Sequence, residues 1–375
     1  MKIKYLFAAG GTAGHINPAI AIAGAIRDIE HNSEILFVGN ENSMEQRLVP
    51  LAGFEFKSIK ISGFKRSFSP KAAIENIKTI KRIFTSSIQS KKIIREFKPD
   101  ICIGTGGYVS GPVVRTAVKM KIPAVIHEQN AYPGVTTKML SKSVKAVMLA
   151  IEEAKNHLKS SCNFIVTGNP VRKEVISSSK ENARAILNLD SRPVILSYGG
   201  SLGARRINEV MASLISRSGM DNQYQHIHAY GQYGKWFPDL VLQKGTDISM
   251  CGNLDVREYI NDMPVCLAAA DLVICRAGAI TISELQVTHK PAILIPSPNV
   301  AENHQYHNAM ALVKAGAAEI IEEKDLTDQL LIKKVDNLLT NKEKLKSLEK
   351  NLKSMAVYDA NERIFAAIKS AYYNS

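Results

Sequence analysis

Short apolar runs alternate with amphipathic stretches along almost the whole chain. The apolar runs have the length of buried strands, and the amphipathic stretches repeat their apolar residues at helical spacing. This βαβα alternation predicts an α/β protein in which helices cover both faces of parallel sheets. We expect strands at Lys4–Ala8, Glu34–Val38, Ile101–Gly104, Ala124–His127, Ala146–Leu149, Phe164–Val166, Val194–Tyr198, His226–Ala229, Leu272–Cys275 and Ala292–Ile295.

The pattern of the first half of the chain recurs in the second half. A strand, the glycine-rich segment Gly10–Gly14 and the helix pattern Ala19–Ile29 open the first half, and a strand, Gly199–Gly203 and the helix pattern Ala204–Ile215 open the second. A chain of 375 residues is also too long for one ordinary core. We therefore predict two doubly wound, Rossmann-like domains, residues 1–166 and 167–356, joined near Gly168–Arg172, with a final helix in 357–375 that packs back on the first domain.

Positive charge is concentrated in one stretch of the sequence. The formal net charge is +13, and residues 57–98 alone hold twelve Lys and Arg against two acids, Glu75 and Glu96. Such a concentration, without interleaved aromatic residues or a nucleic-acid motif, favours a local anionic surface over nucleic acid. The helix pattern in this stretch has two interpretations, an ordinary helix with a solvated basic face or a helix that rests on anionic inner-leaflet phospholipid. We favour the second, with docking residues Lys71, Lys78, Lys81, Arg82 and Phe84.

No apolar run approaches the roughly 18–20 residues that span a bilayer. Residues 1–9 contain an apolar stretch too short for a signal peptide, and it continues directly into the first glycine-rich segment. We interpret it as a buried first strand. The expected location is therefore the cytoplasm.

Glycine-rich turns between a strand and a helix let backbone N–H groups approach a phosphate. Neither turn here matches the dinucleotide fingerprint or the Walker sequence, which argues against NAD and against ATP hydrolysis. The chain contains no Asp-x-Asp pair, so we expect no metal ion at a diphosphate. Helix ends and the cations Arg172 and Arg276 would stabilise the phosphates instead.

Gly199–Gly203 also has the G-x-S-x-G form of the nucleophile elbow of α/β hydrolases. Ser201 would then be a nucleophile, and His304 or His307 could complete a triad in the required chain order. The equivalent first turn has no serine, and an elbow leaves the repeated two-domain pattern unexplained. A hydrolase is thus the less favoured alternative.

Three further polar positions are candidates for chemistry. His15 follows the first glycine turn, where a neutral imidazole could accept a proton from a hydroxyl. His127–Asn130 follows a strand, at the edge where doubly wound sheets bind ligands. Glu284 lies early in a helix pattern, where a carboxylate could accept hydrogen bonds from ribose hydroxyls. The alternative for each is a structural role: a cap for His15, a hydrogen-bonded turn for His127–Asn130 and a salt bridge for Glu284.

Five motifs occur in order in this chain: Gly10–Pro18, His127–Asn130, Gly168–Arg172, Gly199–Arg205 and Ala279–Glu284. Together they resemble the bacterial peptidoglycan N-acetylglucosaminyltransferases of glycosyltransferase family 28, and the resemblance extends over almost the whole chain. Ala13 stands where this family usually has glycine, which a backbone of negative φ would tolerate.

The resemblance implies a GT-B fold, two Rossmann-like domains facing a cleft. It implies inverting transfer of N-acetylglucosamine from UDP-N-acetylglucosamine (UDP-GlcNAc) to the 4-hydroxyl of MurNAc in undecaprenyl-pyrophosphoryl-MurNAc-pentapeptide (lipid I), which gives lipid II for peptidoglycan. The first domain would bind acceptor and membrane, and the second would bind donor, without a cofactor. The enzyme would be peripheral, on the cytoplasmic face of the cell membrane.

Carried over by position, the resemblance makes His15 the candidate general base. It places the donor contacts at Thr12, Ala13, Gly14, Asn130, Arg172, Ser201, Ile260, Ala279, Ile280, Thr281, Ile282, Ser283, Glu284 and Gln305. A UDP-GlcNAc epimerase of the same fold and a non-catalytic sugar-nucleotide sensor remain as alternatives beside the hydrolase.

Overall fold

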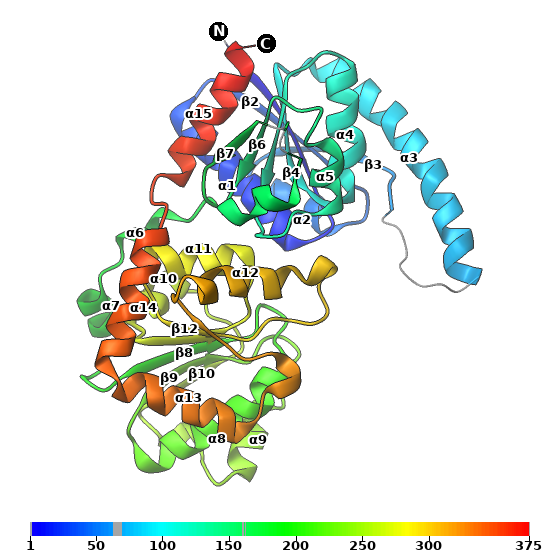
Figure 1. Ribbon diagram of the computed structural model, residues 1–375. Helices are drawn as coiled ribbons and strands as arrows, with labels where there is room; N and C mark the ends of the chain where they lie inside the picture. Colours follow the sequence, from blue (N-terminus) through cyan, green and yellow to red (C-terminus); the bar gives the residue numbers. More distant parts are fainter. Residues whose placement is uncertain (1, 63–69, 160, 162, 375) are drawn as a thin grey trace. The chain divides into compact units, whose positions relative to one another are not determined.

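The computed structural model divides the chain into two compact α/β units (Figure 1). It describes residues 2–62, 70–159, 161 and 163–374, and at 70–81, 83 and 84 it describes the backbone alone. The first unit comprises Met1–Pro170 and Asp359–Ser375, and the second comprises Val171–Tyr358. The division therefore falls within the Gly168–Arg172 turn.

The first unit contains a seven-stranded parallel sheet of order β3-β2-β1-β4-β5-β6-β7. Its strands are β1 (Lys4–Ala9), β2 (Glu34–Asn40), β3 (Glu55–Ile59), β4 (Ile101–Gly106), β5 (Ala124–Glu128), β6 (Ala146–Leu149) and β7 (Phe164–Val166). Its helices are α1 (Ala13–Ile29), α2 (Met44–Leu51), α3 (Pro70–Phe97), α4 (Gly107–Lys119), α5 (Val135–Leu140) and the C-terminal α15 (Ala360–Tyr373).

Helices cover both faces of this sheet because its central strands are apolar on both sides. On β1, Tyr5 and Phe7 point into a core shared with α1 and α15, whereas Leu6 and Ala8 point into a core shared with α3 and α4. In α15, Ile364 and its apolar neighbours lie in the first of these cores. The C-terminal helix is thus an integral layer of the first unit.

The second unit contains a six-stranded parallel sheet of order β10-β9-β8-β11-β12-β13. Its strands are β8 (Val194–Tyr198), β9 (Gln225–Ala229), β10 (Leu254–Arg257), β11 (Leu272–Cys275), β12 (Ala292–Leu294) and β13 (Glu319–Ile320). Its helices are α6 (Lys173–Ser177), α7 (Lys180–Ile186), α8 (Arg205–Asp221), α9 (Phe237–Gln243), α10 (Met263–Ala269), α11 (Ala279–Thr288), α12 (His304–Lys314), α13 (Asp328–Thr340) and α14 (Lys342–Met355).

Both sheets have the strand order of a doubly wound fold, in which the order reverses beside the first strand of the unit. The reversal lies between β1 and β4 in the first unit and between β8 and β11 in the second. Ligands of such sheets bind outside the carboxyl ends of the strands at this point. The predicted fold class, two Rossmann-like parallel-sheet domains, is confirmed, and the glycine turns after β1 and β8 lie at the two ligand-binding positions.

Two local predictions were wrong. Helix α1 begins at Ala13, six residues before the predicted helix pattern Ala19–Ile29, with Pro18 inside it. The pattern also missed β3, β10 and β13, which are all edge strands. Edge strands bury less apolar surface, so their sequences are shorter or more polar than those of central strands.

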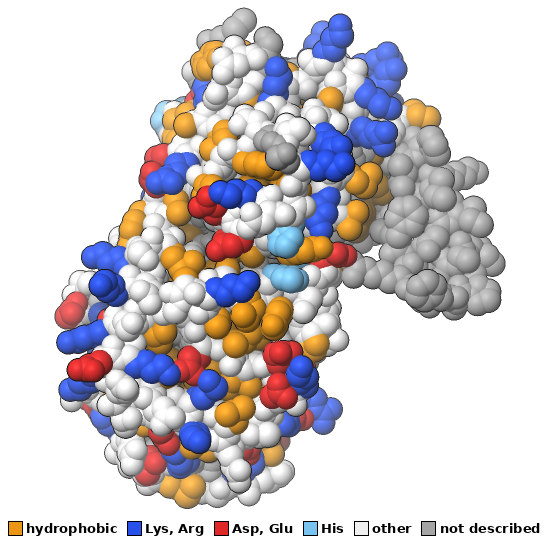
Figure 2. All heavy atoms as spheres, in the orientation of Figure 1, with side chains coloured by type: hydrophobic (Ala, Val, Ile, Leu, Met, Phe, Trp, Pro, Cys, Tyr) orange, Lys and Arg blue, Asp and Glu red, His pale blue; other side chains and the backbone are white. Residues whose placement is uncertain are grey.

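The described helices include none that is both long and apolar enough to cross a membrane. In the first unit, Lys and Arg side chains gather over α4 and α5 (Figure 2). Exposed cations on these helices and their flanking turns are Arg115, Lys119, Lys121 and Lys142.

Candidate functional site

The glycine turn of the first unit is packed against a buried carboxylate. Glu45, only 1% exposed, accepts hydrogen bonds from the N–H groups of Asn40 at 2.9 Å and Gly11 at 3.4 Å. Gly11 has a φ of +89°, and a Cβ there would lie 2.9 Å from the ring of Tyr108. An amide of this turn is therefore already bonded to an anion of the protein itself.

His15 lies in the first turn of α1 and is fixed by the last residues of β4 and by Gln129, which follows β5. Its Nδ1 is 3.1 Å from Oε1 of Gln129, and its backbone carbonyl accepts a hydrogen bond from Thr105 Oγ1 at 2.8 Å. Gly106 has a φ of +105°, and a Cβ at that position would lie 2.7 Å from Nδ1 of His15. The imidazole ring thus fits against a backbone surface that only glycine provides.

His127–Asn130 forms a hydrogen-bonded turn at the carboxyl end of β5. His127 is fully buried with its Nε2 at 2.9 Å from the carbonyl oxygen of Gly168, and burial lowers the pKa of its ring. Glu128 Oε1 accepts hydrogen bonds from both the backbone N–H and the side-chain amide of Asn130, each at 3.1 Å. The carboxylate of Glu128 therefore shapes the turn.

Thr12, Ala13 and Gly14 open α1 at the same edge of the sheet. Thr12 is the N-cap residue and is exposed, with its carbonyl bonded to the N–H groups of His15 and Ile16. Ala13 is helical and has no positive φ. The backbone therefore meets the condition under which alanine replaces glycine here without strain.

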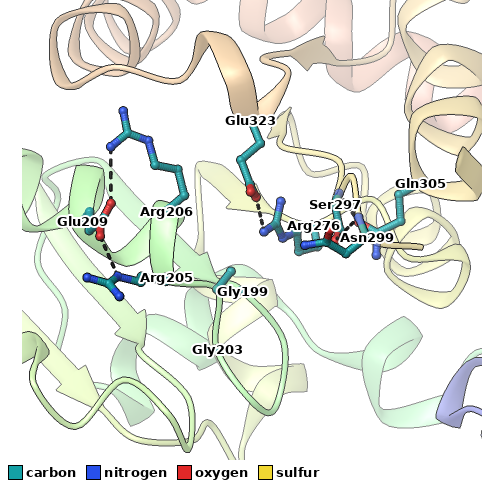
Figure 3. A pocket seen from close by; sticks show the side chains of 11 residues that line it. Gly199, Gly203, Arg205, Arg206, Glu209, Arg276, Ser297, Asn299, Gln305 and Glu323 are labelled. Atoms are coloured by element: carbon teal, nitrogen blue, oxygen red, sulfur yellow. Dashed lines mark hydrogen bonds and ion pairs between the residues drawn. The ribbon is translucent and has the colours of Figure 1, made fainter. Parts of the chain in front are cut away.

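The second glycine turn borders a pocket of about 490 Å³ (Figure 3). Gly203 has a φ of +85°, and a Cβ there would lie 2.2 Å from the carbonyl oxygen of Tyr230. This turn can pack so closely against the Tyr230–Gly231 backbone only because residue 203 is glycine. The other pocket residues are Gly199, Ala204, Arg205, Arg206, Glu209, Arg276, Ser297, Asn299, Gln305 and Glu323.

The three arginines of the pocket differ in their exposure and in the groups that they contact. Arg276 is ion-paired with Glu323 and donates to the carbonyl oxygens of Ile295 and Pro296, each at 3.1 Å. Arg205 is 85% exposed, and its Nε contacts Glu209 Oε1 at 2.9 Å. Arg206 also contacts Glu209 and donates to the carbonyl oxygen of Leu326. Arg205 is therefore a more accessible cation than Arg276. Arg276, which the sequence suggested for phosphate stabilisation, already binds Glu323 and two backbone carbonyl oxygens of the protein.

Helix α11 begins at Ala279, after β11, and contains six of the predicted donor contacts. The first-turn N–H groups of a helix have no partner within the helix. Ile282 is fully buried, and its N–H is bonded to the carbonyl oxygen of Gly278. Ser283 is nearly buried, and its hydroxyl donates to the carbonyl oxygen of Ala279. Ala279, Ile280 and Thr281, at the start of the helix, are half-buried.

Glu284 and Arg172 lie near each other in the second unit. Their Oε1 and Nη2 atoms are 3.8 Å apart, with 12% of the glutamate side chain and 55% of the arginine side chain exposed. Burial raises the pKa of Glu284, and the cation of Arg172 opposes that rise. The structure thus brings together two residues that were predicted independently.

Ser201 does not have the geometry of a nucleophile elbow. It is exposed in the second glycine turn, and its backbone φ is not positive, unlike those of Gly200 and Gly203. In a nucleophile elbow the serine itself occupies the sharp, strained position. Among the described residues no histidine is hydrogen-bonded to Ser201, so the hydrolase alternative lacks both its strained serine and its base.

The remaining predicted residues are placed as follows. Ile260 is buried just after β10, and Gln305 in α12 lines the pocket, where its Oε1 accepts the N–H of Ser297 at 2.9 Å. Thr12, Ala13, Gly14 and Asn130 belong to the first unit, whereas the other donor contacts belong to the second.

For the docking residues, the side chains of Lys71, Lys78, Lys81 and Phe84 lie outside the described part, and Arg82 is exposed. Sequence reasoning missed Arg206, Ser297 and Asn299 as site residues, because only the pocket brings these separate loops together.

Comparisons with known proteins give a consistent picture over the full length. Residues 5–149 match the glycosyltransferase family 28 N-terminal domain, and residues 194–364 match the family 28 C-terminal domain. The chain is 44% identical to the "UDP-N-acetylglucosamine--N-acetylmuramyl-(pentapeptide) pyrophosphoryl-undecaprenol N-acetylglucosamine transferase" of Acetivibrio thermocellus, with 99% of each chain covered. It is 42% identical to the protein of the same name from Clostridioides difficile, with 99% of this chain and 89% of that protein covered.

Two solved structures complete the comparison. The crystal structure of MurG from Acinetobacter baumannii has a TM-score of 0.78 at 26% identity and covers 99% of this chain and 100% of that one. A UDP-N-acetylglucosamine 2-epimerase from Listeria monocytogenes has a TM-score of 0.70 at 15% identity, covers 100% of this chain and 98% of that one, and shows a likeness of fold alone. The identity to the family 28 transferases over the full chain, together with both domain matches, shows that this chain belongs to glycosyltransferase family 28.

Proposed function

We propose that this protein is a hexosyltransferase that moves N-acetylglucosamine from UDP-GlcNAc to the 4-hydroxyl of MurNAc in lipid I, giving lipid II. The observation that carries the proposal is the 44% identity, over 99% of the chain, to a transferase named for this reaction. The two sites fit such a transfer, because one unit holds an imidazole and the other holds a pocket with an exposed cation.

The reaction is a direct displacement with inversion. The 4-hydroxyl oxygen of MurNAc forms a bond to the anomeric carbon of GlcNAc, and the bond from that carbon to the β-phosphate oxygen breaks. The electron pair leaves with UDP, and the hydroxyl proton passes to Nε2 of His15. The product has a β-linkage.

The second unit supplies the donor site in this proposal. Arg205 and the amino end of α8 would interact with the diphosphate, since charge-assisted bonds at a helix start favour an anion. Glu284 would accept hydrogen bonds from the ribose hydroxyls, with Arg172 beside it. The backbone near Ile260 would contact the uracil, and Gln305 would contact the sugar.

The decisive assay is UDP release from UDP-GlcNAc, with and without a short-chain lipid I analogue. We expect release that depends on the acceptor and a product that carries the added N-acetylglucosamine. A UDP-GlcNAc epimerase, the runner-up, would release UDP or convert the sugar without any acceptor. Donor binding without turnover in the presence of the acceptor would contradict the proposal and favour a sensor.

We also propose that α3 docks the enzyme on the anionic inner leaflet, where the lipid acceptor lies. The sequence places Ile74, Ile77, Ile80, Phe84 and Ile88 roughly on one stripe of this helix. Of these side chains the structure describes that of Ile88, which is 70% exposed. The inward face nearby is formed instead by Ser86, Ser90 and Ile94. Ile88 is therefore an apolar residue that faces solvent on a helix rich in cations, as apolar residues of an interfacial helix do.

Vesicle binding tests this docking surface. Each cation near an anionic membrane contributes about 1 kcal/mol, so the triple variant Lys78→Gln, Lys81→Gln, Arg82→Gln should lower partitioning onto phosphatidylglycerol vesicles by roughly 100-fold. The loss should shrink at high salt, because ionic screening also weakens wild-type binding. A matched triple variant on α14, Lys346→Gln, Lys350→Gln, Lys353→Gln, is the control. Equal binding of the α3 variant and the control would refute docking through α3.

A further inference from the structure

A chain of hydrogen bonds runs from the carbonyl of Gly168 through His127 and Gln129 to His15, all within the first unit. We propose that His127 and Gln129 are positioning residues that hold His15 in the tautomer whose Nε2 is unprotonated. This inference rests on the proposed function only for its kinetic consequence, because the tautomer itself follows from the hydrogen-bond geometry.

The first link fixes the protonation of His127. Its Nε2 lies 2.9 Å from the carbonyl oxygen of Gly168, and a carbonyl oxygen can only accept. Nε2 must therefore carry a proton. The ring is fully buried, and burial favours its neutral form, so Nδ1 of His127 is left as an acceptor.

The second link fixes the orientation of the Gln129 amide. Its Nε2 lies 2.9 Å from the backbone carbonyl oxygen of His127, which also can only accept, so the nitrogen and the oxygen of this amide cannot be exchanged. The same nitrogen lies 3.0 Å from Nδ1 of His127 and donates its second proton there. The amide oxygen is thereby directed to the other side.

The third link fixes the tautomer of His15. Oε1 of Gln129 lies 3.1 Å from Nδ1 of His15, and an amide oxygen can only accept, so Nδ1 must be the protonated nitrogen. In the neutral ring the lone pair then belongs to Nε2. Among the described residues Nε2 of His15 has no hydrogen-bond partner. Nε2 is therefore the basic atom, and when it takes up the hydroxyl proton the Nδ1–H bond to Gln129 becomes charge-assisted.

The backbone around His15 keeps the ring in place for this role. Thr105 Oγ1 binds the carbonyl oxygen of His15, and the ring rests against Gly106. Asn169 donates to the carbonyl oxygen of Gln129 at 3.3 Å, which ties the turn after β5 to the segment after β7. A base held in both position and tautomer needs less reorganisation in the transition state.

The tautomer can be read directly in the wild-type chain. We would record ring ¹⁵N spectra of the protein labelled at its nine histidines and assign His15 from the spectrum of the variant His15→Gln. We expect the pattern of a neutral Nδ1–H tautomer at His15. An Nε2–H pattern in the folded wild type would overturn the proposal.

The variant Gln129→Met removes the amide at nearly constant volume. We expect the Nε2–H tautomer of His15 to gain population, kcat to fall about 10- to 100-fold, and KM for UDP-GlcNAc to change less than about twofold. The matched control is Gln225→Met, which removes an equally buried amide with three hydrogen bonds in the second unit. It should leave the spectrum of His15 and kcat unchanged.

An unchanged His15 tautomer in a folded Gln129→Met protein would contradict the role of Gln129. If that variant does not fold, the wild-type spectrum still decides the tautomer, and Gln129→Glu gives a second reading. Its carboxylate can accept from His15 but cannot donate to His127, so it should keep the Nδ1–H tautomer of His15. An Nδ1–H signal in a wild-type protein that shows no transfer would refute the proposed function but leave this inference intact.

Discussion

The two glycine turns occupy equivalent places in the two units but have different electrostatic surroundings. Each follows the first strand of its sheet and precedes a 17-residue helix, α1 or α8. Around the first turn the structure places the buried carboxylate of Glu45 and the imidazole of His15. Around the second it places the exposed cation of Arg205 and a pocket of about 490 Å³.

This difference shows that a glycine turn between a strand and a helix is not by itself enough to make a phosphate site. In the first turn the N–H of Gly11 is bonded to Glu45, and a second anion close by would be repelled. In the second turn the neighbouring cations favour an anion. In the function that we propose, the first unit serves proton transfer and the second binds the charged donor. Each prediction below tests one side of that contrast.

The largest effect is expected at His15 in the first unit. Loss of a general base costs roughly 10²- to 10⁴-fold in rate, so His15→Gln should reduce kcat for UDP release by that factor. KM for the donor should change little, because the donor is assigned to the second unit. His31→Gln, at an exposed histidine of the same unit, is the control. Similar kcat values for the two variants would remove His15 from the chemistry.

The next effect is expected at Glu284, on the donor side. Hydrogen bonds to a charged group are worth about 1.5–3 kcal/mol, so Glu284→Gln should weaken UDP binding roughly 10- to 100-fold in calorimetry. The value of kcat at saturating donor should fall much less. An unchanged dissociation constant for UDP would show that Glu284 does not hold the ribose.

Arg205 should have a smaller effect because it is exposed. Arg205→Ala should raise the dissociation constant of UDP about tenfold, with a loss that diminishes in high salt. The control Arg363→Ala removes an arginine of the first unit whose Nε contacts Asp359 at the same 2.9 Å. Equal donor affinity in both variants would mean that the second turn binds phosphate through its backbone alone.

The pH dependence of donor binding tests whether Arg172 lowers the pKa of Glu284. Burial raises the pKa of Glu284, so its carboxylate becomes protonated at a higher pH than that of an ordinary glutamate. UDP affinity should therefore fall as the pH drops through that raised pKa. Arg172 opposes the rise, so Arg172→Met should move the loss of affinity to higher pH. Titration of UDP binding by calorimetry measures this shift. An unchanged pH dependence in Arg172→Met would show that the 3.8 Å contact has no electrostatic effect.

The smallest effect is expected at Ser201. Ser201 is exposed, and a solvent-exposed hydrogen bond from its hydroxyl to the donor contributes about 1 kcal/mol. Ser201→Ala should therefore change donor affinity by about fivefold or less and leave kcat nearly intact. The wild-type chain should also resist labelling by a fluorophosphonate. Complete loss of activity in Ser201→Ala together with labelling of Ser201 would support the hydrolase alternative. It would also contradict the assignment of the second turn to donor binding.

The sequence predicted the central strands well and the edges poorly. The central strands Val194–Tyr198, Leu272–Cys275 and Ala146–Leu149 have the predicted bounds, and they follow from continuous apolar runs. Of the four edge strands that the structure describes, Phe164–Val166 alone was predicted. The missed strands include Glu55–Ile59, whose exposed positions carry polar side chains, and β13, which is only two residues long and half-buried. A strand at an edge is held by pairing with its neighbour as much as by burial, and pairing leaves little trace in a local pattern.

The amino-acid sequence by itself determined the α/β class, the two repeated halves, both glycine turns and the motifs that identify the family. These features are local, because periodicity and short motifs depend on neighbouring residues. Only the tertiary structure decided which charges remain available. Glu323 forms an ion pair with Arg276, and Glu45 accepts a hydrogen bond from the first turn. Gln129 is hydrogen-bonded to His15, 114 residues away in the sequence. The partner of a side chain is set by the order of strands in a sheet, and that order brings together loops that no local pattern relates.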